Sequence, residues 1–215
     1  MDGYYNSFPD WSDKLAPRIQ KALESRGFAA YYCKTAAEAK EQALELMPEG
    51  SSVSWGGSLS IRDIGLLDAI EAGNYEIIDR ERAETPEERQ ALMRKAFMCD
   101  TYLTSVNAIS EEGEFVNIDG LGNRVAAITF GPDSVIAIVG MNKVCKTLED
   151  AYTRARNYAS PLNTVRLKLK TPCAETGSCS NCKSPSCACS FIVTTRMCRI
   201  PGRIKIILVG EPLGL

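Results

Sequence analysis

Six of the nine cysteines in this 215-residue chain lie in one short stretch, and this clustering limits how the stretch can be held in place. The six are Cys173, Cys179, Cys182, Cys187, Cys189 and Cys198. The residues between them are mostly Ser, Asn, Lys, Gly, Thr and Pro, which bury too little apolar surface to order a segment by packing. We therefore expect disulfides, a metal ion or an iron–sulfur cluster to hold residues 171–198.

The remaining sequence indicates a cytoplasmic protein, in which thiols stay reduced. The N-terminal residues combine acidic side chains with scattered aromatic ones, a pattern typical of neither a secretory signal nor a transit peptide. The longest apolar runs, at 135–139 and 204–209, are far shorter than the roughly 20 residues of a membrane helix, so no membrane span is expected. A reduced compartment favours a metal or cluster site over disulfides.

The chain contains no histidine. This excludes Ser-His-Asp and Cys-His catalysis as well as a His-ligated zinc, so a metal among the cysteines would be bound mainly by sulfur. Cys179 and Cys182 have the C-x-x-C spacing, but Cys187 and Cys189 do not form the second such pair of a zinc ribbon. The irregular spacing favours an iron–sulfur cluster, while zinc and a redox-active thiol pair are the alternatives.

Basic residues outnumber acidic ones from residue 160 onward, although the whole chain has a net charge of −2. Nucleic-acid binding is not expected, because Phe191 is the only aromatic residue available there for base stacking. The basic residues can instead offset the negative charge of a thiolate-ligated site, or form a solvated surface.

Alternating helix and strand patterns predict an α/β fold with a largely parallel sheet and helices on both faces. Residues 1–10 are expected to be a loose arm, and 11–215 one domain that includes the cysteine-rich loop. Predicted helices cover 11–26, 35–47, 58–72, 85–98 and 147–160, the last with Tyr152 and Tyr158 facing the core. Predicted strands cover 51–55, 75–78, 101–106, 115–118, 125–130, 135–139, 191–194 and 205–209.

Polar or glycine-rich turns follow several of these strands, which predicts a binding site for a small anionic ligand at the strand ends. The candidate residues are Gly56, Gly57, Ser58, Asn107, Asp119, Asn123, Arg124, Asn142 and Lys143. The two glycines would let the backbone approach a ligand, and Lys143 could meet a phosphate or carboxylate. The alternative is that Gly, Asp and Asn form turns for backbone reasons alone.

Four stretches resemble the LUD-domain family, the lactate-utilisation proteins, and especially its short single-domain members. They are GGSLSIRDIGLLDAI, SVNAISEEGEFVNIDGLGNRVAAITFGPDSVIAIVGMNKV, TPCAETGSCSNCKSP and PGRIKIILVGEPLGL. The resemblance implies a fold like that of ribose-5-phosphate isomerase, glucosamine-phosphate deaminase and CoA transferases. It also implies a bacterial cytosolic protein that takes part in L-lactate oxidation with iron–sulfur or other oxidoreductase partner subunits.

The same resemblance places the metal or cluster ligands at Cys173, Cys179, Cys182 and Cys189, with Cys187 or Cys198 as alternatives. The function it implies is an accessory or electron-transfer component of a lactate oxidation system that carries a [4Fe–4S] cluster. The alternative is an enzyme or binding protein for a small phosphorylated, carboxylate or CoA-ester ligand, with zinc holding the loop. No catalytic residue follows from the resemblance.

Overall fold

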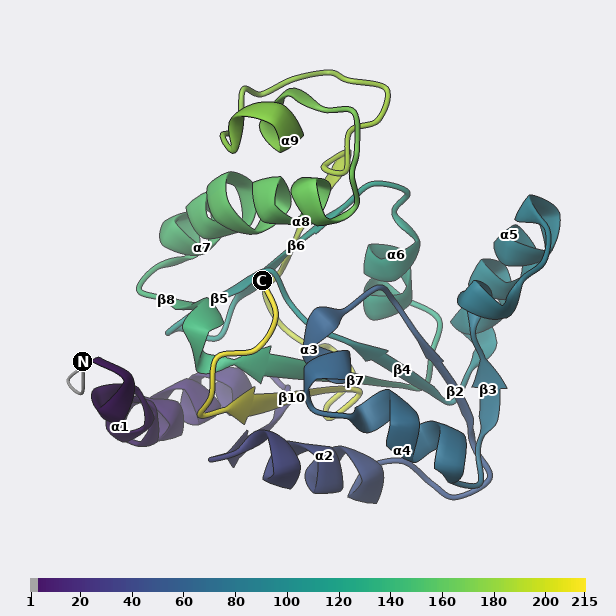
Figure 1. Cartoon of the computed structure of the whole chain (residues 1–215). Helices are drawn as coiled ribbons and strands as arrows, with labels where there is room; N and C mark the ends of the chain where they lie inside the picture. The colour runs from purple at the N-terminus through teal and green to yellow at the C-terminus, as the bar shows by residue number, and fades with distance from the viewer. Residues whose placement is uncertain (1–3) are drawn as a thin grey trace.

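Six parallel strands form the centre of the molecule (Figure 1). The structure is a computed structural model and describes residues 4–215. The strands lie in the order β1, β10, β7, β4, β2, β3, and every neighbouring pair is parallel. Their bounds are β1 Ala29–Cys33, β2 Ser52–Trp55, β3 Glu76–Ile78, β4 Thr101–Thr104, β7 Ser134–Gly140 and β10 Ile204–Val209.

Helices cover both faces of this sheet, as the alternating pattern predicts. Because successive side chains of a strand point to opposite faces, Val135, Ala137 and Val139 of β7 enter one core and Ile136 and Ile138 the other. The first core includes α1 (Tyr4–Ser25). The second includes α2 (Ala36–Glu45), α3 (Leu59–Asp63) and α4 (Leu66–Ala72).

A smaller sheet lies above the first, in the order β8, β5, β6, β9 (Figure 1). Its strands are β5 Ala108–Ser110, β6 Phe115–Asp119, β8 Val144–Cys145 and β9 Phe191–Thr195. A long helical segment covers it, made of α7 (Leu148–Arg154), a π-helical turn (Ala155–Ala159) and α8 (Ser160–Arg166). Ala151 and Ala155 of that segment pack on Val116 and Ile118.

The predicted helix starts at residues 35, 85 and 147 are correct, and each has a threonine cap. The hydroxyl oxygens of Thr35, Thr85 and Thr147 accept bonds from backbone N–H groups three residues later. The second of these helices is α5 (Pro86–Lys95), which lies between the short 3₁₀ turns Arg80–Arg82 and Ala96–Met98. The cysteine-rich loop contains one short helix, α9 (Pro172–Thr176).

Several sequence predictions are wrong. The strand expected at 125–130 is the helix α6 (Asn123–Thr129), which begins after Gly122 in the left-handed region at φ 84°. Its two alanines favour a helix, and Val125 and Ile128 at i, i+3 spacing are buried. The helix expected over 58–72 is two helices, because Gly65 at φ 68° interrupts it. Residues 4–10 of the expected arm belong to α1, whereas residues 1–3 lie outside the described part.

The helix that begins after Thr147 continues beyond Pro161 instead of ending before it. Pro161 occupies the first turn of α8, where its missing N–H does least harm, directly after the π-helical turn. Tyr152 and Tyr158 do not face the core, since they are 38% and 55% exposed. Alanines face the smaller sheet in their place, which brings the helix close to it.

Candidate functional site

The carboxyl ends of β2, β4 and β7 meet at one edge of the six-stranded sheet, and a cleft of about 560 Å³ lies there. We call it the strand-end cleft. Its lining includes the turn after β2, the segment after β4, the turn between β6 and α6, Lys143 after β7, the helix α8 and part of the cysteine-rich loop. Ligands of open parallel sheets bind at such strand ends, so the topology and the cavity indicate the same location.

Seven of the nine predicted ligand-binding residues line the strand-end cleft: Gly57, Ser58, Asn107, Asp119, Asn123, Arg124 and Lys143. Gly56 lies behind it, where a Cβ would be 3.2 Å from the Arg124 side chain and from the Tyr102 hydroxyl. Asn142 has a different place, because its Oδ1 accepts a bond of 3.1 Å from the Leu213 backbone N–H. Neither Gly56 nor Asn142 is among the residues that line the cleft.

Arg124 uses all five of its N–H donors within the protein. The acceptors are Asp119 Oδ2 at 3.3 Å, the Ser105 carbonyl at 3.3 Å, Asn117 Oδ1 at 2.8 Å, Asn107 Oδ1 at 3.2 Å and the Ile118 carbonyl. The guanidinium therefore joins β6, α6 and the segment after β4. Toward a ligand it contributes positive charge, with no donor left over.

The carboxylate of Asp119 likewise makes its hydrogen bonds within the protein. Its Oδ1 accepts bonds from the backbone N–H groups of Leu121 and Gly122, at 3.2 and 2.9 Å. Its Oδ2 faces Arg124, which neutralises the carboxylate. Asp119 therefore serves the backbone turn, which was the alternative to a ligand-binding role. It shapes the wall of the cleft by holding Arg124 and the start of α6.

Lys143 is buried with 3% exposure, at the end of the 3₁₀ turn Met141–Lys143. Its Nζ donates to Ser60 Oγ at 2.8 Å and to Ser105 Oγ at 2.9 Å. Burial, followed by the charges of Arg154 and Arg124, lowers the pKa of Lys143 to about 7. A substantial fraction of this amine is therefore uncharged near neutral pH.

Sequence reasoning missed Arg80, Ser105 and Arg154. Arg80 and Ser105 line the strand-end cleft, and Arg154 donates to the Asn107 carbonyl at 2.6 Å. Ser105 could have been predicted from the sequence, because it directly follows β4 at the sheet edge that carries the other candidates. No sequence pattern indicates the two arginines, because their positions depend on the packing of the 3₁₀ turn at 80–82 and of α7.

Five of the six clustered cysteines line a second cavity, of about 140 Å³: Cys173, Cys179, Cys182, Cys187 and Cys189. We call it the cysteine cavity. All five thiols are free and half-buried. The sulfurs of Cys187 and Cys189 are 3.0 Å apart. Cys187 and Ala188 line the strand-end cleft as well, so the two cavities share a wall.

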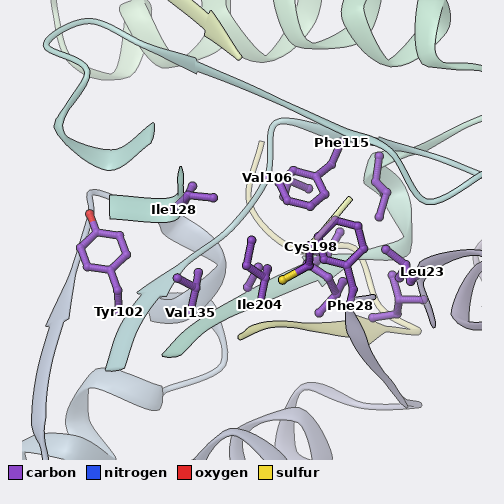
Figure 2. Packing of buried hydrophobic residues seen from close by; sticks show 14 of the residues in the cluster. Leu23, Phe28, Tyr102, Val106, Phe115, Ile128, Val135, Cys198 and Ile204 are labelled. Atoms are coloured by element: carbon purple, nitrogen blue, oxygen red, sulfur yellow. The ribbon is translucent and has the colours of Figure 1, made fainter. Parts of the chain in front are cut away.

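Cys198, named as an alternative ligand, lies elsewhere. It is 6% exposed within the hydrophobic core beside Phe28 and Ile204, as Figure 2 shows. Its Sγ donates to the Ile200 carbonyl at 2.9 Å. It does not line the cysteine cavity, because the strand β9 between Cys189 and Cys198 carries the chain away from the loop.

The donor set of the cysteine cavity suits a sulfur-ligated group. Arg156 lines the cavity, and its hydrogen bond to Cys179 lowers the pKa of that thiol, which favours the thiolate that a metal requires. Burial and the neighbouring Cys187 raise the pKa of Cys189 to about 12, so its thiol would ionise only with a cation present. Among residues 4–215 no three Cys, Asp or Glu side chains form a group arranged to hold a single metal ion.

A model of the LUD domain matches residues 16–209, which is most of the chain. The chain belongs to the LUD-domain family. No curated protein matches the sequence significantly. In the described part of the chain, no helix is both long and apolar enough to cross a membrane.

Two solved structures are similar to different degrees. A DUF162 family protein from Deinococcus radiodurans aligns over 92% of this chain and 97% of its own, with 13% identity and a TM-score of 0.55. That likeness shows the fold. A ribose 5-phosphate isomerase A from Neisseria gonorrhoeae aligns over 54% of this chain and 56% of its own, with 14% identity and a TM-score of 0.36, too low to support an argument.

Proposed function

We propose that this LUD-domain protein is an accessory or electron-transfer component of an L-lactate oxidation system, and that it carries a [4Fe–4S] cluster. The observation that supports this most directly is the gathering of five free thiols around one cavity. The ligands we propose are Cys173, Cys179, Cys182 and Cys189. Such a cluster, when bound, accepts and releases single electrons.

The arrangement of the thiols supports a cluster over zinc. One zinc ion needs four sulfurs around a single point, whereas the four irons of a cluster each take one thiolate and so accept sulfurs that are farther apart. The thiols line a common cavity but do not converge on one point. Arg156 supplies positive charge that offsets part of the negative charge of a thiolate-ligated cluster.

The position of the loop suits electron exchange with a partner. The cysteines are half-buried, and most of the residues between them are exposed or half-buried. An iron–sulfur partner subunit, or another oxidoreductase, could therefore approach the cluster from the loop side. The wall shared by the cysteine cavity and the strand-end cleft also brings a bound small molecule close to the cluster.

The test is iron, sulfide and zinc analysis with an absorption spectrum, on protein purified without oxygen. We expect about four irons per chain and a broad visible band. The variant C179A should lose iron, whereas C198A should keep it despite a lower stability. One zinc without iron, or full iron content in C179A, would contradict the proposal.

A second function is favoured by the charges of the strand-end cleft: binding of a small carboxylate or phosphorylated ligand. Arg80, Arg124 and Arg166 line the cleft, while the carboxylate of Asp119 is paired with Arg124. A ligand present at about a hundredfold its Kd stabilises the folded state by about 2.7 kcal/mol. Thermal unfolding with lactate, pyruvate and phosphate, under metal-free conditions, measures this binding separately from the cluster.

A further inference from the structure

The amine of Lys143 has an unusual set of neighbours for a buried lysine. It lines the strand-end cleft, and its nearest polar partners are the two hydroxyls of Ser60 and Ser105. Among the residues that the structure describes, no carboxylate forms an ion pair with it. A buried ammonium without a counter-ion is costly, so the surroundings favour the uncharged amine.

The hydrogen bonds around this amine suit an uncharged nitrogen. Ser60 Oγ donates to Ser105 Oγ at 3.2 Å, and Ser105 Oγ donates to the Val106 carbonyl at 3.4 Å. Both hydroxyl hydrogens are thereby used, so both serine oxygens receive their bonds from Lys143. A neutral amine has two N–H groups, and these two bonds use both. The lone pair of the nitrogen is left without a partner, as in an amine that acts as a nucleophile.

The charges nearby support the same protonation state. Arg154 and Arg124 lower the pKa of Lys143 in addition to the effect of burial, and Asp63, which raises it, has the weakest influence of the three. The carboxylate of Asp63 also accepts a bond of 2.8 Å from the Gly214 backbone N–H. The amine therefore remains largely available as a free base in the physiological range.

The rest of the cleft selects the kind of molecule that meets this amine. Arg80 and Arg166 are positively charged, and the guanidinium of Arg124 adds charge although its donors are all occupied. A volume of about 560 Å³ is within the range of small-molecule sites. An anionic compound with an electrophilic carbon fits both the charge of the cleft and the lone pair of Lys143.

We propose that Lys143 is the nucleophilic amine of a covalent site in the strand-end cleft, and that this site takes a small carboxylic acid with an adjacent carbonyl, a 2-oxo acid. The nitrogen lone pair forms a bond to the carbonyl carbon. After proton transfers the carbonyl oxygen leaves as water, and uptake of one proton gives an iminium ion. No electrons are gained or lost overall. This inference rests on the anion binding proposed for the cleft, and it does not depend on the cluster.

The test is trapping with pyruvate and borohydride in metal-free protein, because hydride addition to the iminium carbon gives a stable secondary amine. Intact-mass measurement gives the yield, and peptide mapping of the wild-type chain locates the adduct. At pH 7 an ordinary lysine, with a pKa of about 10.4, is uncharged only about once in a few thousand molecules, so we expect Lys143 to dominate by a hundredfold or so.

Variants and a neutral probe complete the design. K143R removes the nucleophilic amine, and it should abolish the main adduct. K146R, at the exposed neighbour that bonds Glu111, should leave it unchanged. Acetone, which has the carbonyl but no carboxylate, should trap far less.

Three results would overturn the proposal. Adducts spread evenly over the surface lysines would exclude a special role for Lys143. Stabilisation by pyruvate without any adduct would exclude covalent chemistry while leaving anion binding intact. If pyruvate neither stabilises the protein nor forms an adduct, the anion-binding function of the cleft fails together with the inference.

Discussion

The backbone of Gly120 lies directly against that of Cys187, so that a Cβ placed on Gly120 would be 3.5 Å from the Cys187 carbonyl oxygen. Gly120 belongs to the turn between β6 and α6, and Cys187 to the cysteine-rich loop. The contact seats the loop on the wall of the strand-end cleft. A larger side chain on one side of this contact should therefore displace the backbone on the other side.

A small and a large side chain at position 120 should have different effects on the cysteine-rich loop: a methyl group should be tolerated, whereas a larger side chain should displace the loop. Gly120→Ala places its Cβ at an ordinary contact distance of 3.4 Å from the Ala188 Cα and should change little. Gly120→Leu adds atoms that the loop backbone must avoid, so we expect lower iron retention and faster proteolysis within 171–190. The melting temperature should fall only modestly, because the loop adds little to the hydrophobic core. Equal iron content in both variants would show that the contact does not seat the loop.

Removal of the Arg124 guanidinium should cost several times more stability than removal of an exposed arginine. Arg124→Gln leaves buried acceptors on Asn117 and Ile118 without donors, which costs about 1–3 kcal/mol for each unsatisfied group. Arg124→Lys should rescue little, because an ammonium cannot supply five donors in a planar arrangement. Urea unfolding at neutral pH measures the loss.

The matched control for Arg124 is Arg82→Gln. Arg82 pairs with Glu71 at 3.1 Å, and both side chains are 54% exposed. An exposed pair contributes about 0–1 kcal/mol, so this variant should unfold almost as the wild type does. Similar losses in both variants would mean that the bonds of Arg124 do not hold the wall of the cleft.

Gly122→Ala should destabilise the chain more than Gly177→Ala does. Both glycines have left-handed backbones, at φ 84° and 74°, where a Cβ costs about 1 kcal/mol. At Gly122 the Cβ would also be 3.1 Å from the Phe191 ring, whereas Gly177 has nothing within 4 Å. We therefore expect about 2 kcal/mol for Gly122→Ala, measured by urea unfolding. A difference of zero between the two variants would show that the Phe191 ring moves away freely.

The sheet and the position of the strand-end cleft were predictable, because apolar runs at regular spacing decide both. The run Val135–Gly140 is apolar throughout, as a central parallel strand requires, and the polar turns follow such strands. The strand predicted at 125–130 failed because a short apolar run does not distinguish a buried strand from a buried helix. Gly122, which directly precedes the helix, is equally compatible with a turn between two strands.

The role of each site residue depended on contacts that no spacing encodes. Arg124, Asp119 and Asn142 were expected to meet a ligand, yet all three bond chiefly to the protein. Of the predicted ligand-binding residues, Lys143 is the one whose side chain is a buried amine without a carboxylate partner in the described structure. The cysteine spacing predicted a common site, but Cys198 belongs to the hydrophobic core, since it follows a strand that leaves the loop.

The stability of the folded state should rise with pH because of Lys143. The pKa of this amine is about 7 in the folded protein, against an ordinary value of 10.5, so between these values the unfolded chain binds more protons. Stability from this group therefore increases as pH rises from about 7 to about 10.5. Below about 7 both states are protonated, and the cost of the buried charge is present in full. At about 1.4 kcal/mol per pKa unit, that cost amounts to several kcal/mol.

Lys143→Met removes this group and should flatten the pH dependence. The variant should be more stable than the wild type at and below about pH 7, and the difference should shrink toward pH 10.5. Urea unfolding of both proteins across this range gives the difference at each pH, in which contributions from other titrating groups cancel. Lys146→Met, at an exposed side chain that pairs with Glu111, should shift the stability by less than about 1 kcal/mol. A constant difference between Lys143→Met and the wild type would mean that Lys143 keeps its charge when folded, and the amine would then have no free lone pair to offer a ligand.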